Sequence, residues 1–476
     1  MTMALTRIRT DLCIIGAGSG GLSIAAGAAQ MGARVVLVEG AEMGGDCLNA
    51  GCVPSKALIA AAKHAHAMTT GAPFGVAPVT PQIDFAAVKD HVARVIDTIA
   101  PMDSQERFEG FGVNVIRAYG AFISPTELQA GDTIIRARRF IIATGSRPLI
   151  PPIPGIDTVP YFTNETIFGL RERPGHLIII GGGPIGMEMA QAHRRLGCEV
   201  TVTEGATALG KDDPELAALV LTALRAEGVT ILENAPVSSI SGSPGAVTVT
   251  LNDGTTLTGS HLLVAAGRKV ALDRLDLSAA NVAHTAKGVT VGLNLRSSNR
   301  RIYAVGDAAG GLQFTHVAGY HAGVIIRSAM FGLPSRAKSA HIPWVTYTDP
   351  ELAQVGMTEA QALATHGKAV TVTRFEFKHN DRAQTMRDTQ GLIKVMVLKG
   401  RPIGASIAGP QAGELIGLWA LAISANLKMS AIAGMVAPYP TLGEISKRAA
   451  GAYFSPQLFA NPTVKRVVRL VQRFLP

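Results

Sequence analysis

The apolar and polar positions of this chain repeat one pattern twice. The stretch that begins at Asp11 reads DLCIIGAGSGGLSIAAGAAQMGARVVLVEGAEMGG, and the one that begins at His176 reads HLIIIGGGPIGMEMAQAHRRLGCEVTVTEGATALG. Offset by 165 residues, they align without a gap and are identical at 13 of 35 positions. Each contains an apolar run, a glycine turn, a helix-like stretch and a second apolar run. The pattern predicts a buried strand, a turn, a helix and a second strand in both places.

The glycines of the two turns have the spacing of a dinucleotide-binding turn. They are Gly16, Gly18 and Gly21 in the first copy and Gly181, Gly183 and Gly186 in the second. The first glycine permits a tight turn, the second lets the backbone approach a pyrophosphate, and the third brings the helix against the strand. Each second strand ends in an acid, Glu39 or Glu204, suited to accept hydrogen bonds from a ribose. The chain is therefore predicted to bind two dinucleotides.

The surroundings of the two copies indicate which nucleotide each one binds. The first copy runs directly into two cysteines, Cys47 and Cys52, and a flavin beside a dithiol can pass electrons to it. We therefore expect FAD in the first copy and a nicotinamide nucleotide in the second. Glu204 would repel a 2′-phosphate, and no arginine follows it before Lys211, so the sequence favours NADH over NADPH.

Size and composition set the broad class of the protein. A chain of 476 residues is too long for one ordinary core and suggests about three domains. With 47% hydrophobic and 17% charged residues it is globular, and its net charge of +9 is not gathered into a patch interleaved with aromatics, as nucleic-acid binding would require. The N-terminus lacks the apolar stretch of a signal peptide, and the longest apolar run, at 415–427, is too short to span a bilayer. A cytoplasmic location is expected.

The two cysteines lie in GGDCLNAGCVPSK, residues 44–56. In a helix, residues five apart have Cα atoms about 8.5 Å apart, and a disulfide needs less than about 7 Å. We therefore expect Cys47 in a loop and Cys52 in the first turn of a helix, whose N-terminus favours the reactive thiolate.

Two alternatives to a redox pair remain open. A zinc site would need further ligands, and the local histidines, His64 and His66, match no common zinc spacing. A structural disulfide is unexpected in the cytoplasm. The remaining cysteines, Cys13 and Cys198, lie in or beside predicted strands and are expected to be inert core residues. No metal site is predicted.

Several motifs together resemble the flavin-dependent pyridine nucleotide–disulfide oxidoreductases, a family that includes dihydrolipoamide dehydrogenase, glutathione reductase and mercuric reductase. These motifs are GGDCLNAGCVPSK, the duplicated glycine turn, ATGSRP at 143–148, AAGR at 265–268, IYAVGDAAG at 302–310 and TDPELAQVGMTEAQA at 348–362. The resemblance implies an α/β homodimer with two Rossmann-like dinucleotide-binding domains and an α+β dimerisation domain. It implies an FAD domain in two segments, 1–152 and 271–338, an NAD(P) domain at 153–270 and an interface domain at 339–476.

The resemblance also implies roles for individual residues. Asp307 would hold the flavin ribityl chain, and Lys56 and Glu188 would pair near the flavin. Taken alone, Lys56 also fits a solvated helix residue and Glu188 an ordinary first-turn acid. Thr144 and Gly145 of ATGSRP and Gly267 of AAGR would line the cofactor sites.

The implied reaction passes electrons from NADH through FAD to Cys52, the sulfur nearer the flavin. Cys47 would then be the exposed interchange thiol that attacks the acceptor.

The resemblance breaks near the C-terminus. Disulfide-acting members of the family carry His-Pro-Thr followed by a glutamate, and the histidine, supplied by the partner subunit, shuttles protons to the dithiol. This chain reads APYPTLGE at 437–444, with Tyr439 in place of the histidine and Glu444 as the acid. Tyrosine is a poor base at neutral pH, so dihydrolipoamide oxidation should be slow; a packing role for Tyr439 is the alternative. Mercuric reductases resemble the chain in having a tyrosine near this place, but it lacks their C-terminal cysteine pair.

The C-terminal tail has a basic amphipathic pattern. On a helix, one face would carry Val464, Val467, Val468, Val471 and Phe474, and another would carry most of Lys465, Arg466, Arg469 and Arg473. Such a helix suits an anionic membrane surface; a solvated or dimer-packing tail is the alternative.

The sequence thus predicts an FAD- and NADH-dependent oxidoreductase that acts through Cys47 and Cys52 on a disulfide or another thiol-reactive acceptor, a soft metal ion included. A lipoamide dehydrogenase that lacks the usual histidine is the second hypothesis. A flavin-binding redox sensor or membrane-recruited partner with little turnover is the third.

Overall fold

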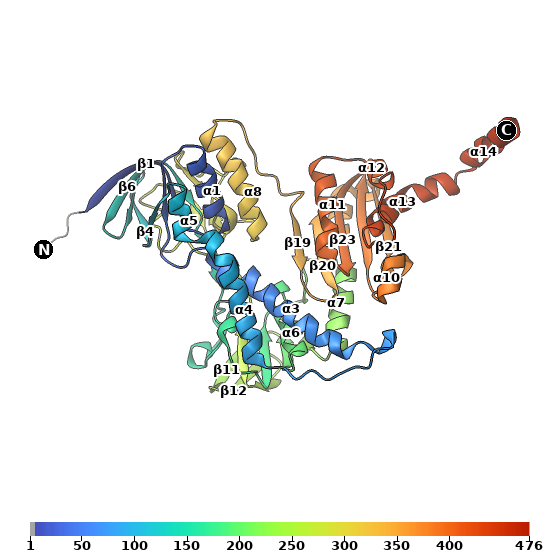
Figure 1. Cartoon of the computed structure of the whole chain (residues 1–476), viewed down its shortest axis with the longest axis horizontal. Coiled ribbons are helices and arrows are strands. Elements are labelled where there is room, and N and C mark those ends of the chain that lie inside the picture. The colour runs from blue at the N-terminus through green and yellow to red at the C-terminus, as the bar shows by residue number, and fades with distance from the viewer. Residues whose placement is uncertain (1–4, 476) are drawn as a thin grey trace.

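The computed structural model describes residues 5–475 of the chain. Its first unit is a seven-stranded sheet in the order β3–β2–β1–β6–β5–β4, with β18 also paired to β6 (Figure 1). The strands are β1 (Thr6–Ile15), β2 (Val35–Val38), β3 (Asn114–Ile116), β4 (Gly120–Ser124), β5 (Glu127–Ala130), β6 (Thr133–Ile142) and β18 (Ile302–Ala304). Strand β18 comes from much later in the chain and extends this first sheet.

Strand β1 ends in four consecutive apolar residues, LCII at 12–15, because both of its faces are buried there. Leu12 and Ile14 pack into one core, while Cys13 and Ile15 pack into a second core on the opposite face. Both faces of a parallel strand are covered in this way, so its residues need not alternate with polar ones. Burying one such side chain contributes about 1.5–3 kcal/mol. Helices α1 (Ser19–Gln30) and α8 (Thr315–Ile325) pack against each other beside this sheet.

The second unit is a four-stranded parallel sheet in the order β10–β9–β8–β14. Its strands are β8 (His176–Ile180), β9 (Glu199–Thr203), β10 (Thr230–Leu232) and β14 (His261–Val264), and helices α6 (Pro184–Arg195) and α7 (Pro214–Ala226) follow β8 and β9. An antiparallel sheet of β11 (Val237–Ser243), β12 (Ala246–Leu251) and β13 (Thr256–Gly259) adjoins it. The chain passes between the first and second units twice. The two connecting segments form an antiparallel pair of strands, β7 (Ser146–Pro148) and β15 (Arg268–Val270).

The third unit is a five-stranded antiparallel sheet in the order β19–β20–β23–β22–β21. The strands are β19 (Pro343–Thr346), β20 (Glu351–Gly356), β21 (Val370–Glu376), β22 (Leu392–Leu398) and β23 (Arg401–Gly409), and helices α11 (Ala412–Ser424) and α13 (Glu444–Phe459) pack on it. The fully buried Trp419 fills the core beneath these helices and donates its indole N–H to Ser446 Oγ at 3.1 Å. The fold class expected from the sequence, two Rossmann-like units and an α+β unit, is confirmed.

A buried lysine joins the second and third units. Lys394 of β22 donates to Asp213 at 2.9 Å and to Glu359 at 2.8 Å, and it lies 2.6 Å from Glu215. Asp213 also caps α7, so the ammonium group ties the start of that helix to the five-stranded sheet. A buried cation is stable only with such partners, and three carboxylates supply them.

The end of the chain leaves the body of the molecule. Helix α14 (Pro462–Phe474) follows α13 and projects outward, at the red end of the ribbon (Figure 1). Among the described residues, no helix is both long enough and apolar enough to cross a membrane.

Candidate functional site

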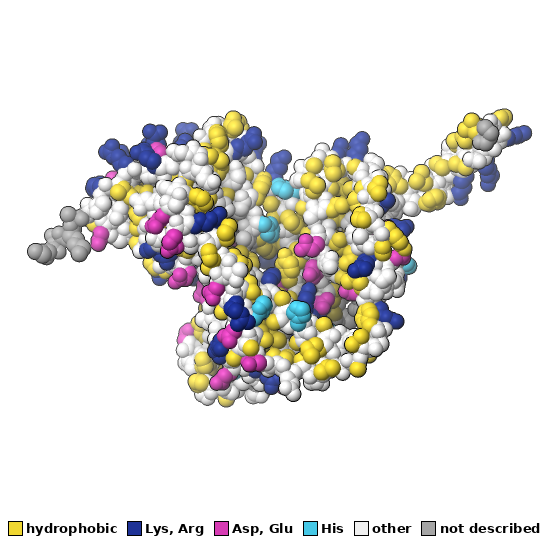
Figure 2. Space-filling model, in the orientation of Figure 1, with side chains coloured by type: hydrophobic (Ala, Val, Ile, Leu, Met, Phe, Trp, Pro, Cys, Tyr) yellow, Lys and Arg dark blue, Asp and Glu magenta, His cyan; other side chains and the backbone are white. Residues whose placement is uncertain are grey.

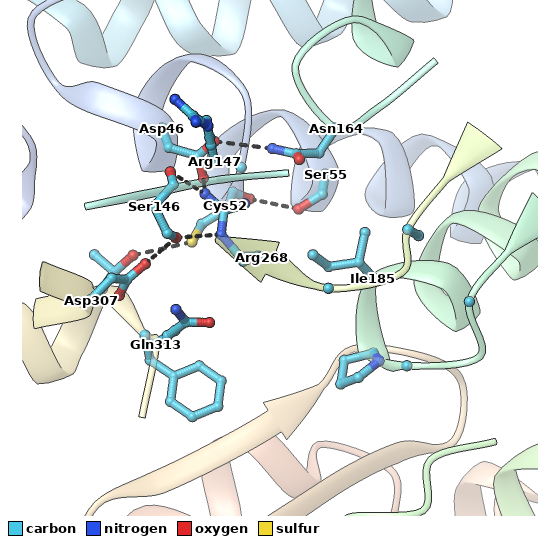
Figure 3. A pocket seen from close by; sticks show the side chains of 18 of the residues that line it. Asp46, Cys52, Ser55, Ser146, Arg147, Asn164, Ile185, Arg268, Asp307 and Gln313 are labelled. Carbon is cyan, nitrogen blue, oxygen red and sulfur yellow. Dashed lines mark hydrogen bonds and ion pairs between the residues drawn. The ribbon is translucent and has the colours of Figure 1, made fainter. Parts of the chain in front are cut away.

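One large cleft lies between the three units and has a volume of about 2750 Å³. Both glycine turns, the two cysteines and Asp307 line it, together with Tyr347 from the stretch that follows β19. Residues from segments far apart in the chain converge in its wall, among them Asp46, Cys52, Ser146, Arg268 and Asp307 (Figure 3). The cleft therefore joins two nucleotide-type turns to a pair of thiols.

The first glycine turn has the strained geometry that its sequence predicts. Gly16 has φ +107°, and a Cβ there would lie 2.4 Å from the Ala143 carbonyl oxygen. A Cβ on Gly21 would lie 1.9 Å from the Gly16 carbonyl oxygen, so helix α1 can approach β1 only with glycine there. A Cβ on Gly18 would have open space around it, since the nearest atom, Gly45 Cα, would be 4.0 Å away. The Glu39 carboxylate accepts the backbone N–H of Ala17 at 2.6 Å, which places this acid at the mouth of the turn.

The second turn repeats this geometry. Gly181 has φ +115° and a Cβ position 2.4 Å from the Ala265 carbonyl oxygen, and a Cβ on Gly186 would lie 1.9 Å from the Gly181 carbonyl oxygen. At Gly183 a Cβ would meet no atom of the described residues within 4 Å. Glu204 accepts the Gly182 N–H at 2.7 Å, as Glu39 accepts that of Ala17. The two copies are therefore alike in contacts as well as in sequence.

The cleft fits dinucleotides on its own geometry. The second glycine of each turn leaves room for a pyrophosphate beside the backbone. Thr144 Oγ1 is buried at the cleft without a hydrogen-bond partner among residues 5–475, which leaves it able to bond to a ligand atom. Gly145 and Gly267 also line the cleft and have positive φ angles of +65° and +120°.

The two cysteines lie at the starts of successive helices. Cys47 belongs to α2 (Gly45–Asn49), and Cys52 is the first residue of α3 (Cys52–Thr69). The expected position of Cys52 is therefore correct, but Cys47 lies in a short helix where a loop was expected. The break at Ala50 and Gly51, both outside helical geometry, is what lets the two sulfurs come together. Both cysteines are free thiols here.

The pKa values of the two thiols shift in opposite directions, and Cys52 becomes the more acidic of the pair. The hydrogen bond from Cys47 lowers the pKa of the Cys52 thiol to about 6, with help from the Thr315 hydroxyl and the charge of Lys56 and against the effect of burial. Cys47 behaves in the opposite way: its hydrogen bond to Cys52, followed by burial, raises its pKa. Thr315 Oγ1 lies 3.3 Å from the Cys52 sulfur. At neutral pH the arrangement favours one thiolate and one thiol.

The expectation that Cys47 is the exposed interchange thiol concerns the flavin-loaded enzyme and stays a prediction. In this chain Cys52 is exposed and Cys47 is half-buried. Cys52 begins α3 on the wall of the cleft (Figure 3), and Cys47 belongs to α2.

Lys56 and Glu188 form the ion pair that the resemblance implied. Lys56 Nζ donates to Glu188 Oε2 at 2.7 Å, and Glu188 is only 5% exposed. The other carboxylate oxygen accepts the backbone N–H of Tyr347 at 2.9 Å, and the Lys56 ammonium lies 4.5 Å from the centre of the Tyr347 ring. The lysine side chain is thus held from two sides, one turn along α3 from Cys52.

Asp307 belongs to a polar network that sequence reasoning missed. Ser146 Oγ donates to Asp307 at 2.5 Å, and Arg268 Nε donates to Ser146 Oγ at 2.7 Å (Figure 3). Arg268 also pairs with Asp46 at 3.1 Å, next to Cys47 in the chain. Burial raises the pKa of Asp307, against the Ser146 hydrogen bond and the Arg268 charge. Ser146, Arg268 and Asp46 lie inside the motifs ATGSRP, AAGR and GGDC. Those motifs were the only sequence signal that could have indicated the network.

Tyr439 and Glu444 are not among the described residues that line the cleft. Tyr439 is 68% exposed, and its hydroxyl donates to Asp381 at 2.9 Å. That hydrogen bond and the charge of Asp381 raise the pKa of Tyr439 above its ordinary value, at which the phenol is already neutral at pH 7. Asn380 beside it donates to the Thr441 carbonyl at 3.1 Å and so attaches the same loop to the start of α10 (Asp381–Met386). Neither Asp381 nor Thr315 had a sequence signal.

The remaining cysteines are core residues. Cys13 and Cys198 are fully buried, and burial raises the pKa of both thiols, that of Cys198 to about 11. Within residues 5–475, no three His, Cys, Asp or Glu side chains gather in a way that could hold a metal ion.

Two family models match nearly the whole chain. One, described as pyridine nucleotide-disulphide oxidoreductase, matches residues 10–322, and the other, the dimerisation domain of the same family, matches 342–450. A mercuric reductase of Streptomyces lividans is 33% identical over 94% of this chain and 96% of its own length. A dihydrolipoyl dehydrogenase of Geobacillus stearothermophilus is 34% identical over 93% and 96%.

Solved structures show the same likeness. The Cu(II) complex of the HOCl-induced flavoprotein disulfide reductase RclA from Escherichia coli has a TM-score of 0.83 at 30% identity, covering 92% of this chain and 99% of its own. LpdA from Mycobacterium tuberculosis has a TM-score of 0.85 at 26% identity, covering 94% and 99%.

Proposed function

The chain belongs to the pyridine nucleotide-disulphide oxidoreductases, and from this premise we propose that it passes electrons from NADH to a disulfide or another thiol-reactive acceptor through FAD and the Cys47–Cys52 pair. The observation that carries the proposal is the position of the two thiols in one cleft with both dinucleotide turns. FAD, when bound, supplies two-electron chemistry between the nicotinamide and the disulfide. Its site is assigned to residues 1–152 and 271–338, the NADH site to 153–270, and the subunit contact to 339–476.

The thiols carry the acceptor half of the reaction. With a disulfide as acceptor, Cys47 passes its proton to the Cys52 thiolate and attacks one of the acceptor's sulfurs as a thiolate. A mixed disulfide forms, and the first sulfur leaves as a thiol by taking that proton from Cys52. The Cys52 thiolate then attacks the Cys47 sulfur, which releases the second thiol and restores the Cys47–Cys52 disulfide. The overall balance is NADH, a proton and a disulfide converted to NAD⁺ and two thiols. The lowered pKa of Cys52 supports its role as the thiolate that closes the cycle.

NADH preference is proposed from the acids at the second turn. Glu204 is anchored on the Gly182 and Ala206 N–H groups, where its charge opposes a 2′-phosphate. Arg225 also lines the cleft but is engaged by Glu233 at 2.8 Å.

We expect the kcat/KM for NADH to exceed that for NADPH about tenfold or more, because a repulsion of about 1.4 kcal/mol is enough for that ratio. Glu204→Ala should lower the ratio, as measured by steady-state NADH and NADPH oxidation. Glu39→Ala, the equivalent change in the first copy, is the matched control: it should weaken FAD retention and leave the ratio unchanged. An unchanged ratio in Glu204→Ala would contradict the assignment.

Tyr439 bears on which class of acceptor the enzyme reduces. The match to a dimerisation domain supports a homodimer, and by family resemblance the loop of Tyr439 and Glu444 would meet the thiols of the partner subunit. Tyrosine is neutral at pH 7, and the bond to Asp381 raises the pKa of Tyr439 further, so this phenol can donate a hydrogen bond but cannot accept a proton at pH 7. This supports an acceptor whose reduction does not depend on a histidine base, such as a soft metal ion or a reactive disulfide.

A panel of acceptors with NADH tests the proposal. We expect turnover with one or more of glutathione disulfide, Hg(II) and Cu(II), and slow turnover with lipoamide. Cu(II) is included because of the RclA complex. Flavin reduction by NADH without reoxidation by any acceptor would instead support the redox-sensor alternative.

Tyr439→His should raise lipoamide turnover at neutral pH by about 10²-fold, because histidine can take and give the proton that tyrosine cannot. The pH profile of kcat should then gain a limb near pH ~6.5. Tyr439→Phe is the control: it keeps the ring and should gain neither activity nor the new limb. Equal lipoamide rates in the two variants would show that residue 439 does not handle the proton.

A further inference from the structure

Helix α14 is unused by the proposed reaction and lies outside both family ranges, which end at residues 322 and 450. It projects from the body of the molecule beyond α13 (Figure 1). Its start is well defined: Asn461 caps it by accepting the Thr463 N–H at 2.9 Å, and Pro462 occupies the first turn. The chain therefore builds a regular helix none of whose residues is buried against the rest of the described chain.

The two faces of α14 differ in chemistry. At about 100° per residue, the apolar side chains occupy one arc of the helix and the basic side chains occupy the opposite arc. The apolar arc holds Val464, Val467, Val468, Leu470, Val471 and Phe474, and the basic arc holds Lys465, Arg466, Arg469 and Arg473. No residue of α14, all of which the structure describes, is buried, and Phe474 is 71% exposed. Dark-blue and yellow side chains both appear along the projecting helix (Figure 2).

The charge of this region selects among possible occupants of the apolar face. After Glu444, every Asp, Glu, Lys or Arg of the described chain is a cation: Lys447, Arg448, Lys465, Arg466, Arg469 and Arg473. Two copies of α14 packed on each other would bring like charges together, which disfavours a helix pair. An anionic surface complements both faces at once, because it offers phosphates to the cations and acyl chains to the apolar side chains.

We propose that α14 binds the surface of membranes that contain anionic phospholipids and holds the enzyme there. The helix lies in the plane of the interface with its valine and phenylalanine side chains among the upper acyl chains. Its guanidinium groups contact lipid phosphates. The exposed side chains of Leu458 and Phe459, at the end of α13, extend the apolar surface toward the body of the molecule.

Sedimentation of the full-length, FAD-loaded protein with vesicles tests the proposal. Vesicles of phosphatidylcholine alone are compared with an equimolar mixture of phosphatidylcholine and phosphatidylglycerol. We expect the partition coefficient to be about tenfold or more higher on the anionic vesicles and to fall as salt is raised.

Three sets of substitutions identify the surface responsible. Val467→Gln with Val471→Gln and Phe474→Gln removes the apolar face, and Lys465, Arg466, Arg469 and Arg473 changed together to Gln remove the basic face. Each set should lower binding to anionic vesicles about tenfold or more. The matched control removes the same number of exposed cations elsewhere by changing Arg9, Arg136, Arg300 and Arg301 to Gln, and it should keep binding. Flavin absorbance and NADH oxidation in solution check that each variant is folded.

Two outcomes would overturn the proposal. Equal binding by the α14 variants and the wild-type protein would show that another surface contacts the vesicles. Absent vesicle binding, together with weaker dimers in the α14 variants by analytical ultracentrifugation, would make α14 a contact between two copies of this chain. Neither outcome depends on which acceptor the enzyme uses.

Discussion

Cys47→Ser and Cys52→Ser are each expected to abolish acceptor turnover, by about 10³-fold or more. A hydroxyl cannot form the disulfide that receives the electron pair, and each variant leaves a single sulfur in the cleft. Without Cys47 the proposed attacking thiol is missing, and without Cys52 the mixed disulfide on Cys47 is not resolved. Steady-state NADH oxidation with the best acceptor of the panel measures the loss.

Both variants should keep the steps that precede the thiols. FAD should remain bound, because neither sulfur belongs to the glycine turns, and NADH should still reduce the flavin in a single turnover. Cys198→Ala is the matched control: this buried thiol lies outside the cleft, so its loss should leave acceptor turnover in place. Full acceptor turnover in either Ser variant would remove the pair from the reaction.

Gly21→Ala and Gly186→Ala are expected to separate the two nucleotide sites. In each case the new Cβ would lie 1.9 Å from the carbonyl oxygen of the turn's first glycine, so the helix must move away from its strand. Such overpacking costs about 1–3 kcal/mol and distorts the turn. Gly21→Ala should lose FAD, measured by flavin absorbance after gel filtration. Gly186→Ala should keep FAD and raise the KM for NADH about tenfold or more.

Two further glycine variants control for general damage. A Cβ at Gly183 meets no described atom within 4 Å, so Gly183→Ala should fold normally and still weaken NADH binding, because the methyl group occupies the proposed pyrophosphate position. Gly110, at the exposed end of α5 (Gln105–Gly110), also has open space, and Gly110→Ala should change neither cofactor. Loss of FAD from Gly186→Ala with retention in Gly21→Ala would exchange the two assignments.

Local patterns predicted the parts of the fold that depend on neighbouring residues. The apolar runs and glycine turns indicated β1, α1 and β2, and again β8, α6 and β9, because a strand or helix is defined by a short period along the chain. The helix after Cys52 was predicted in the same way. Cys47 was placed wrongly, since a five-residue helix such as α2 is too short to show a period.

The contacts between residues far apart in the chain could not be predicted from local patterns. Lys56 and Glu188 are 132 residues apart, and only the family resemblance brought them together before the structure did. Thr315 lies 263 residues from Cys52, and Asp381 lies 58 residues from Tyr439. Nothing in the spacing of these residues indicates a contact, because their distances depend on how segments far apart in the chain pack.

The sequence alone therefore determined the chemistry that the chain can carry: two dinucleotide turns, a thiol pair beside the first of them, and a tyrosine where a histidine is expected. Those features depend only on residue type and on spacing within short stretches of the sequence. The tertiary structure decided which thiol is the thiolate, because the Cys47 hydrogen bond, Thr315 and Lys56 act on Cys52 only after segments far apart in the chain have packed together. It also decided that the Tyr439 hydroxyl is bonded to Asp381 and that the apolar face of α14 is left exposed. Hydrogen bonds, burial and charge act over a few ångströms in space, and packing alone sets those distances.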